Sequence, residues 1–259
     1  MLLHLLFRLY YHKLTKVDKS IKIWYNYHVL ICNIDTSNPK RKKIQMVTYE
    51  KSASFNKEAH KLNYILTAPN DIKPDEKLPL IVFLHGAGER GDDIEKLKVY
   101  CVPKLFTKNE EHNGVRAYTL SPQCLAYPFT WYDLKNEVMA LIDSIVSSNQ
   151  IDQKKVSLCG ISMGGFGTWE LAMTYPDRFY KIAPLCSGGM SWRAWTLKMP
   201  VRAFHGKRDD VVPYEYSSLM VNAVKASGGN VELISYDDLG HNCWDRAFEE
   251  TDLVKWLVE

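Results

Sequence analysis

The residues with the clearest chemical potential form the stretch GISMG at positions 160–164, which fits the pattern G-x-S-x-G around Ser162. The apolar run VSLC precedes this stretch and the helix-like run GFGTWELAM follows it, so the serine stands at a strand-to-helix turn. In that context the backbone turns sharply and lifts the hydroxyl above the sheet, where it can attack a carbonyl carbon. Because serine and glycine also fill ordinary turns, Ser162 is a nucleophile only if the chain supplies a base, an acid and an oxyanion site.

A base must accept the proton of the serine, and His241 is the best placed of the eight histidines. It lies in DDLGHNCWD, between the last strand-like run and the final helix-like run, directly after Gly240. A lone histidine is often only a solvated or packed side chain. An imidazole in such a late loop can, however, take up a proton near neutral pH and return it to a leaving group.

An acid must orient that base, and FHGKRDDVVP offers two neighbouring carboxylates, Asp209 and Asp210, at the end of a strand-like run. Carboxylates at this place also form turns or cap helices, and one of the two is expected to do so. The nucleophile, the acid and the base then follow one another along the chain as Ser, Asp and His. This is the order that enzymes with a G-x-S-x-G turn above a parallel sheet use.

An oxyanion site needs backbone N–H groups that point at the charge developing on the substrate. One donor is expected to be the amide of Met163, immediately after the serine. The other should come from the glycine-rich loop FLHGAGERGDD, in which we select Ala87. In the same loop His85 is expected to shape the backbone by hydrogen bonding. Glu89 and Arg90 are expected to pair, although the guanidinium could instead face a substrate carboxylate.

The elements that must position these residues alternate between strand and helix from about residue 60. This alternation predicts an α/β fold with a mostly parallel central sheet, helices on both faces and no large cap domain. Strand-like runs lie at 62–69, 78–86, 116–123, 155–160, 180–188, 200–206 and 231–238, and helix-like runs at 133–148, 164–175, 215–229 and 244–259. Asp133 is expected to cap the first of these helices.

Charge and cysteine content narrow the class of protein. Residues 1–45 hold nine basic and two acidic residues, whereas the remainder holds 24 and 28. The mildly acidic remainder argues against a nucleic-acid groove. The six cysteines show no metal-binding spacing, so we expect reduced thiols, a cytoplasmic location and no metal. No run reaches the roughly 18 apolar residues of a membrane helix.

We divide the chain into a basic extension, 1–45, which is either an upstream addition or a genuine arm, and a catalytic domain, 46–259.

Taken together, the motifs LHGAGERGDD, GISMGGFGTWELAMTYPDRF, FHGKRDDVVP and GHNCWD resemble the α/β-hydrolase superfamily over about residues 60–259. Within it the chain is most similar to small esterases and peptidases related to dienelactone hydrolases, feruloyl-type carbohydrate esterases and the prolyl-oligopeptidase catalytic domain. The resemblance implies a Ser–His–Asp mechanism without a cofactor. In its H-G-x-x-D-x-x-V-P pattern the acid falls on Asp209 and not on Asp210.

The substrate is less well defined than the chemistry. The connection CSGGMSWRAWTLKMP is short, so we expect an open, shallow site without a mobile lid. Aromatic residues in loops could surround its mouth or pack in the core: Trp131, Tyr132, Trp192, Trp195 and Trp244. The leading hypothesis is a carboxylic ester hydrolase acting on a small-molecule or saccharide-linked ester. The alternatives are a serine peptidase of prolyl-oligopeptidase type and a non-catalytic binding protein. The sequence does not determine the oligomeric state.

Overall fold

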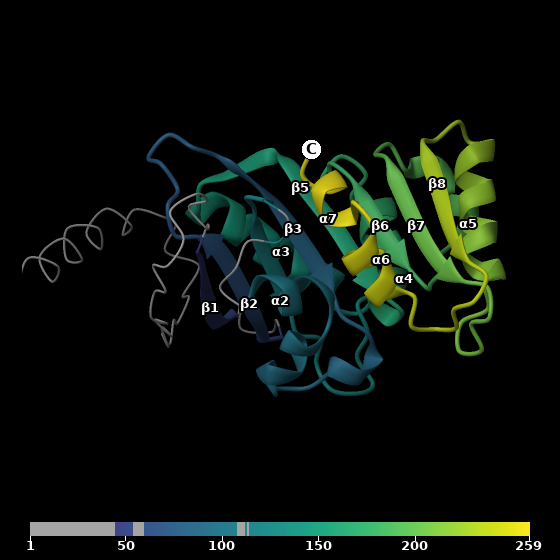
Figure 1. The fold of residues 1–259 in the computed structure, drawn as a ribbon, viewed down its shortest axis with the longest axis horizontal. Coiled ribbons are helices and arrows are strands. Elements are labelled where there is room, and N and C mark those ends of the chain that lie inside the picture. Colours follow the sequence, from purple (N-terminus) through teal and green to yellow (C-terminus); the bar gives the residue numbers. More distant parts are fainter. Residues whose placement is uncertain (1–44, 54–59, 108–111, 113) are drawn as a thin grey trace, which may run out of the picture.

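Eight strands form one sheet within the part of the chain that the computed structural model describes, residues 45–53, 60–107, 112 and 114–259. Their spatial order is β1-β2-β4-β3-β5-β6-β7-β8 (Figure 1). The strands are β1 (Met46–Ala53), β2 (Leu62–Pro69), β3 (Leu78–Leu84), β4 (Tyr118–Pro122), β5 (Ile151–Ile161), β6 (Ile182–Leu185), β7 (Val201–Gly206) and β8 (Val231–Tyr236).

The strand directions bring the loops that carry the candidate site to one edge of the sheet. The pairs from β4 through β8 are all parallel, and only β1–β2 and β2–β4 are antiparallel. Parallel strands end at the same edge, so the connections that follow β3, β5, β7 and β8 start side by side. These connections hold the glycine-rich loop, Ser162, Asp209 and His241, in that order. The expected α/β fold with a mostly parallel sheet is confirmed.

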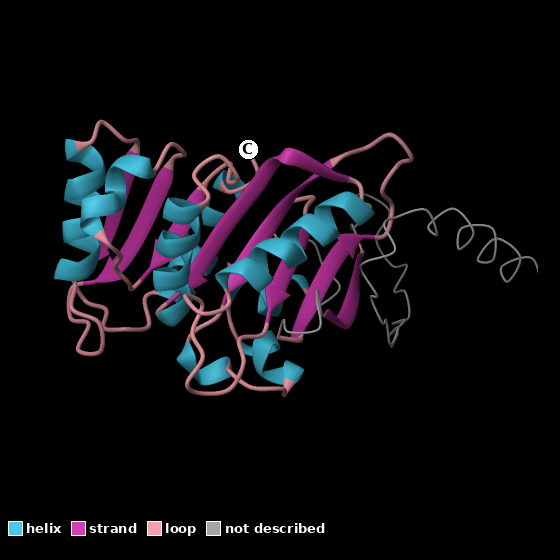
Figure 2. Ribbon diagram, turned by 180° about the vertical axis from the view of Figure 1, so that it is seen from behind, coloured by secondary structure: helices cyan, strands magenta, loops and turns pink. Residues whose placement is uncertain are grey.

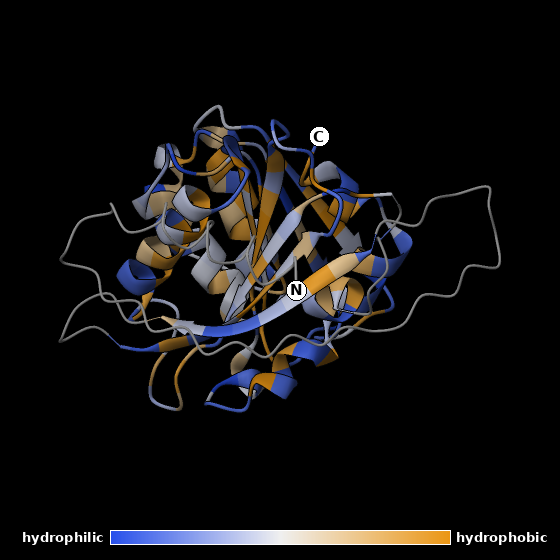
Figure 3. Ribbon diagram, turned by 90° about the vertical axis from the view of Figure 1, so that its left-hand side faces the viewer, coloured by the Kyte–Doolittle hydropathy of each residue, from blue (hydrophilic) through white to orange (hydrophobic). Residues whose placement is uncertain are grey.

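Helices cover both faces of the sheet, because the central strands are apolar on both sides. In β3, Leu80, Val82 and Leu84 face one core, whereas Ile81 and Phe83 face the other. This is the side-chain alternation of a strand buried on both faces. Figure 3 shows hydrophobic residues concentrated on the central strands and hydrophilic ones toward the periphery.

The first core lies beneath α3 (Lys135–Ser148), α4 (Met163–Thr174) and α5 (Glu215–Ala226). The second lies beneath the shorter helices α2 (Cys101–Phe106), α6 (Trp244–Glu250) and α7 (Leu253–Trp256). Figure 1 shows α6 and α7 in yellow on the near side of the sheet, and Figure 2 shows the longer helices from behind. Three 3₁₀ helices, η1 (Ala87–Glu89), η2 (Ile94–Val99) and η3 (Ser191–Thr196), lie in connections between these elements.

Three local expectations need correction. Strand β1 was not expected, since MVTYEKSA buries only its two end residues and carries little apolar alternation. Asp133 does not cap α3: its carboxylate accepts the backbone and hydroxyl protons of Thr130, and Leu134 occupies the cap position. The final helix is interrupted, because Thr251 adopts an extended conformation between α6 and α7.

The expected basic extension lies outside the described residues, apart from Gln45, and β1 begins at Met46. No helix in the described part of the chain is long and apolar enough to span a membrane. The cysteines at 101, 124, 159, 186 and 243 are free and buried. The cytoplasmic location stays a prediction.

Candidate active site

Ser162 occupies the sharp turn that the sequence predicts. Its backbone has φ 51° and ψ −118°, a left-handed conformation that costs a non-glycine residue energy. Two backbone hydrogen bonds hold it there: its N–H donates to the Leu185 carbonyl at 3.0 Å, and its carbonyl accepts from the Phe166 N–H at 3.0 Å. The second bond opens α4, so the hydroxyl stands between the end of β5 and the positive end of a helix.

Two glycines allow strand and helix to meet at this turn. A Cβ on Gly160 would lie 2.8 Å from the Leu84 carbonyl oxygen, and a Cβ on Gly164 would overlap the same oxygen. In both cases the Cβ would meet a backbone oxygen, which cannot move aside as the end of a flexible side chain can. The glycines of G-x-S-x-G are therefore required by close approach.

The structure joins Ser162, His241 and Asp209 in one hydrogen-bond chain. The Ser162 Oγ lies 2.9 Å from His241 Nε2, and His241 Nδ1 lies 2.8 Å from Asp209 Oδ2. The carboxylate can only accept, so Nδ1 carries the ring proton and Nε2 accepts from the serine. The three residues come from the connections after β5, β7 and β8 and are 32 or more residues apart in sequence. The arrangement can transfer the serine proton to the imidazole.

The Asp209 side chain is fully buried and remains ionised through its hydrogen bonds. Burial alone would raise the pKa of Asp209. The bonds from His241 and from the backbone N–H groups of Val212 and Val211 outweigh burial, so the pKa lies below its usual value. The neighbouring Asp210 is exposed, and the structure brings Asp209 rather than Asp210 to the histidine.

The glycine-rich loop after β3 lies against the serine, because a Cβ on Gly86 would be 3.8 Å from that of Ser162. Two hydrogen bonds of the buried His85 ring stabilise this loop. The ring's Nε2 accepts the Cys124 N–H at 2.9 Å, so its Nδ1 carries the proton and donates to the Gly86 carbonyl at 2.6 Å. Burial lowers the pKa of His85 to about 4, and the ring is neutral at pH 7.

The two expected oxyanion donors stand next to residues of the site in the chain: Ala87 follows Gly86, and Met163 follows Ser162. Ala87 begins η1 and is exposed, and Met163 begins α4. The expected pairing of Arg90 with Glu89 is not what the structure shows. Arg90 donates instead to the carbonyls of Ala87 at 3.0 Å and Phe129 at 3.3 Å, because these oxygens lie within reach of the folded-back guanidinium.

The phospholipase/carboxylesterase family matches residues 132–253, the part of the chain that contains the serine, the aspartate and the histidine. The chain belongs to the α/β-hydrolase superfamily. A thermostable esterase of known structure is 27% identical, with a TM-score of 0.70, over 81% of this chain and 62% of that one. An acetyl xylan esterase from Paenibacillus sp. R4 covers 97% of this chain and 93% of its own, at 12% identity and a TM-score of 0.65.

One curated relative is a bifunctional acetylxylan esterase/xylanase from Neocallimastix patriciarum, 36% identical over 80 residues. Those residues are 30% of this α/β-hydrolase and 12% of the relative, so the chain corresponds to a small part of that protein.

The tryptophans of this α/β-hydrolase divide into three kinds. Trp244 begins α6 and packs edge-on against the His241 ring, with 5.5 Å between centroids. Trp131 is fully buried and donates from Nε1 to the His85 carbonyl at 3.0 Å. It therefore supports the glycine-rich loop from the core and does not line a mouth, which corrects its expected role.

Trp192 and Trp195 are about three-quarters exposed, at 73% and 72%. They belong to η3, whose intervening Arg193 donates to Glu170 and Thr174 in the second half of α4. Helix α4 starts beside Ser162, so η3 packs near the far end of that helix. The backbone of η3 thus packs against the second half of α4, whereas the hydroxyl stands at the start of that helix.

Sequence reasoning missed one residue at the site, His205. It is fully buried at the end of β7, and its Nε2 lies 3.0 Å from the same Asp209 Oδ2 that faces His241. The available signal was the spacing in FHGKRD, where the histidine precedes the aspartate by four residues. The histidine is in the strand and the aspartate in the loop that follows, which folds back on the strand.

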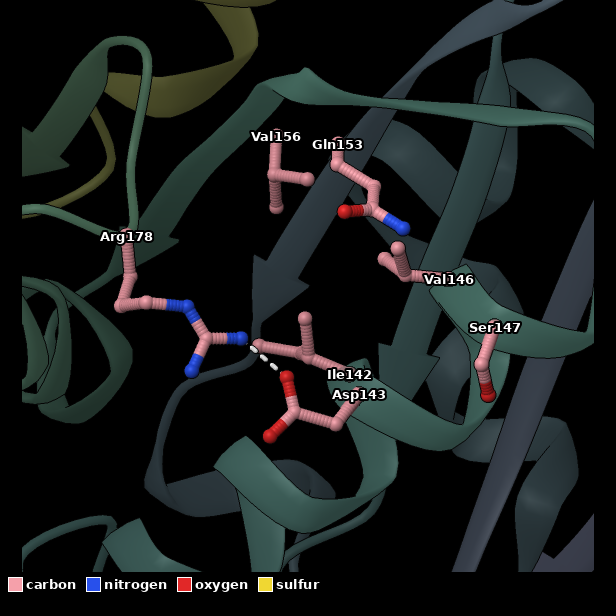
Figure 4. Close-up of a pocket in the computed structure, with 7 residues that line it drawn as sticks. All are labelled: Ile142, Asp143, Val146, Ser147, Gln153, Val156 and Arg178. Atoms are coloured by element: carbon pink, nitrogen blue, oxygen red, sulfur yellow. Dashed lines mark hydrogen bonds and ion pairs between the residues drawn. The ribbon is translucent and has the colours of Figure 1, made fainter.

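A separate cavity of about 270 Å³ lies between α3 and the start of β5, and the ion pair of Arg178 with Asp143 lies in it (Figure 4). The β5 residue of its lining that is nearest to Ser162 in the chain, Val156, precedes the serine by six positions, or roughly 20 Å of strand. The cavity is therefore not part of the candidate site. The described residues hold no cluster of three or more histidines, cysteines or carboxylates that could bind a metal ion.

Proposed function

We propose that the protein is a serine hydrolase that cleaves carboxylic esters through an acyl-enzyme, and that residues 46–259 carry this activity. The observation that carries the proposal is the unbroken chain from Asp209 through His241 to Ser162, with atom separations of 2.8 and 2.9 Å. A serine hydroxyl by itself is a weak nucleophile, and a hydrogen-bonded imidazole held by a carboxylate is what activates it.

In the first half of the reaction Ser162 Oγ attacks the ester carbonyl carbon and His241 Nε2 takes the hydroxyl proton. The imidazolium that forms is stabilised by the ionised Asp209 through the bond at Nδ1. The carbonyl oxygen becomes an oxyanion, for which the N–H groups of Met163 and Ala87 are the proposed donors. The C–O bond to the alcohol then breaks, and His241 returns its proton to the departing oxygen.

In the second half a water molecule attacks the acyl group on Ser162, with His241 again as the base. The tetrahedral intermediate collapses to release the carboxylic acid, and the proton returns to the serine. Each proton thus moves between Nε2 and an oxygen, while Nδ1 keeps its own proton. No metal-bound water is required, since the imidazole generates both nucleophiles.

The substrate class follows from how open the site is. His241 keeps 18% of its side chain exposed, and η3 is the one helical element within the β6–β7 connection, all of which the structure describes. A site of this kind accepts an ester carried on a larger molecule. The resemblance to acetylxylan esterases favours small acyl groups attached to a saccharide.

The test is a substrate panel on purified full-length protein. The panel contains p-nitrophenyl acetate and butyrate, methyl hydroxycinnamates, acetylated xylan and a prolyl-peptide anilide, and a fluorophosphonate probe reports the serine directly. The key variant is Ser162→Ala. The matched control is Ser121→Ala, which removes a buried hydroxyl on β4 that has no hydrogen-bond partner among the described residues.

Ester turnover and probe labelling are expected for the wild type and Ser121→Ala, and both should fall to background in Ser162→Ala while its folding transition persists. Cleavage of the anilide in preference to the esters would transfer the protein to the serine peptidases. Absence of labelling on a folded wild type would refute the proposal and leave a binding protein on the same fold. Turnover that survives in Ser162→Ala would reject the serine as nucleophile.

A further inference from the structure

The triad aspartate contacts a second histidine, His205, which the mechanism above does not use. His205 is the penultimate residue of β7, and none of its side chain is exposed. Its Nε2 lies 3.0 Å from Asp209 Oδ2 and 2.9 Å from the Val212 carbonyl oxygen. Its Nδ1 lies 2.7 Å from the Ser217 hydroxyl, on α5. Every polar atom of the ring therefore has a partner on a neighbouring element.

These partners fix where the ring carries its proton. An ionised carboxylate and a backbone carbonyl can only accept, so Nε2 must be protonated to bond with either. Burial lowers the pKa of His205, which favours the neutral ring at pH 7. In the neutral ring Nδ1 is an acceptor, and the Ser217 hydroxyl is the donor within reach. That hydroxyl lies equally close, 2.7 Å, to the Ser187 carbonyl, and its single proton serves one of the two at a time.

The His205 bond completes the hydrogen bonding of the aspartate. Oδ1 accepts from the N–H groups of Val211 at 2.9 Å and Val212 at 2.8 Å. Oδ2 accepts from His241 at 2.8 Å and from His205 at 3.0 Å. A carboxylate has about four acceptor positions. Three of them have a donor of their own here, and the fourth shares the Nε2 proton of His205 with the Val212 carbonyl oxygen. Without His205, Oδ2 would be buried with one acceptor position empty, and the carboxylate could rotate.

We propose that His205 is a positioning residue that holds Asp209 Oδ2 toward His241 and limits how strongly the carboxylate stabilises the imidazolium. The proposal rests on the function proposed above. The Nε2–H of His205 draws electron density from the oxygen that His241 also uses. Removing that donor leaves more negative charge on Oδ2, which favours a proton on His241, and a protonated His241 cannot act as a base.

Few other titratable groups face this network. The Tyr214 ring lies edge-on to His205, 5.7 Å between centroids, and its hydroxyl bonds to Ser235. The thiol of Cys186 interacts electrostatically with Asp209 and contacts the thiol of Cys243. Burial raises the pKa of Cys186 well above its usual value, so this thiol stays neutral while a histidine titrates. A shift in the pH profile on changing His205 therefore reports on the two histidines and Asp209.

The experiment compares His205→Asn with His205→Gln. A glutamine amide reaches the Nε2 position and can still donate to Asp209, whereas an asparagine amide reaches only the Nδ1 position and leaves Oδ2 short of a donor. The rate of fluorophosphonate labelling is measured from pH 5 to 9, a readout that needs no natural substrate.

For His205→Asn the acid limb should move up by roughly half a pH unit or more. Its labelling rate at pH 8 should fall about tenfold through lost alignment. His205→Gln should keep the limb where the wild type has it and recover most of the rate. An unmoved limb in His205→Asn, or equal shifts in both variants, would overturn the proposal and leave His205 with a merely structural role.

A second measurement on the wild type guards against variants that fail to fold. Two-bond proton–nitrogen NMR correlation of the histidine rings at pH 7 should show His205 protonated at Nε2, and an unprotonated Nε2 would overturn the proposal. This result does not depend on catalysis. If the wild type is not labelled at Ser162, the proposed function fails, while the protonation of His205 still decides whether it holds Asp209.

Discussion

Acidification from pH 7 to pH 5 is expected to destabilise the protein through His85, the neutral histidine beneath the glycine-rich loop. Burial holds the pKa of His85 at about 4, against a usual value of 6.5 in the unfolded chain. Between these two values the unfolded chain binds the extra proton and the folded chain does not. Stability from this residue is therefore fully present above pH 6.5 and is lost as the pH falls toward 4.

The size of the effect follows from the two pKa values. At pH 5 the unfolded histidine is almost fully protonated and the folded one is about one-tenth protonated. The linkage relation then gives a loss of about 2 kcal/mol relative to pH 7. No reduction for solvent screening is needed, because 2% of the side chain is exposed. With a urea m-value of about 3 kcal/mol per molar, the unfolding midpoint should fall by ~0.7 M.

The assay is equilibrium urea unfolding at pH 7 and pH 5, on the wild type and on His85→Gln. The glutamine oxygen can still accept the Cys124 N–H but does not titrate. Since other groups also titrate, the informative quantity is the difference in unfolding free energy between wild type and variant. That difference should shrink by about 2 kcal/mol between pH 7 and pH 5. Parallel pH dependences in the two proteins would refute the reasoning, because His85 would then not be the group that resists protonation.

The remaining predictions concern the site and its surroundings. Gly164→Ala should destabilise the protein by about 1–3 kcal/mol in urea unfolding and abolish fluorophosphonate labelling, since its Cβ would overlap the Leu84 carbonyl; a labelled, stable variant would contradict the close approach. Asp209→Asn should lower kcat/KM for p-nitrophenyl acetate about 10⁴-fold, while the exposed Asp210→Asn leaves it unchanged; equal losses would show that the acid is misassigned. Trp192→Ala with Trp195→Ala should leave kcat/KM for the same small ester within about twofold, because surface changes away from the site cost little; a large loss would put η3 at the site after all.

The site could be predicted because each of its motifs encodes a backbone requirement. G-x-S-x-G specifies a turn so tight that a Cβ on Gly160 or Gly164 collides with strand β3. The order of Ser162, Asp209 and His241 then needs only the rule that parallel strands end at one edge. Neither inference depends on details of packing, so sequence alone was sufficient to bring these residues together.

What sequence could not supply are features decided by tertiary contact. Strand β1 exists because it pairs with β2 along its whole length. Nothing in the sequence MVTYEKSA indicates that pairing. Trp131 and Trp192 look alike as loop aromatics, yet one is fully buried beneath His85 and the other is 73% exposed. Helix α3 begins at Lys135, so Leu134 takes the cap position. The Asp133 carboxylate bonds to Thr130 instead, because side-chain bonds within a turn compete with helix caps.

Among the described residues, His85, His205 and His241 lie at or next to the site. The exposure of each ring to water decides whether it can gain and lose a proton during turnover. The side chains of His85 and His205 are 2% and 0% exposed, and both nitrogens of each ring contact groups that the fold holds in place. Such a ring cannot gain or lose a proton in each turnover without breaking a buried bond. His241 is 18% exposed, and among the described residues the hydrogen-bond partner of its Nε2 is the Ser162 hydroxyl, a group that itself gives up a proton. His241 is thus the one of the three that can cycle between charge states, while the other two are suited to hold the loop of Ala87 and the carboxylate of Asp209 still while it does so.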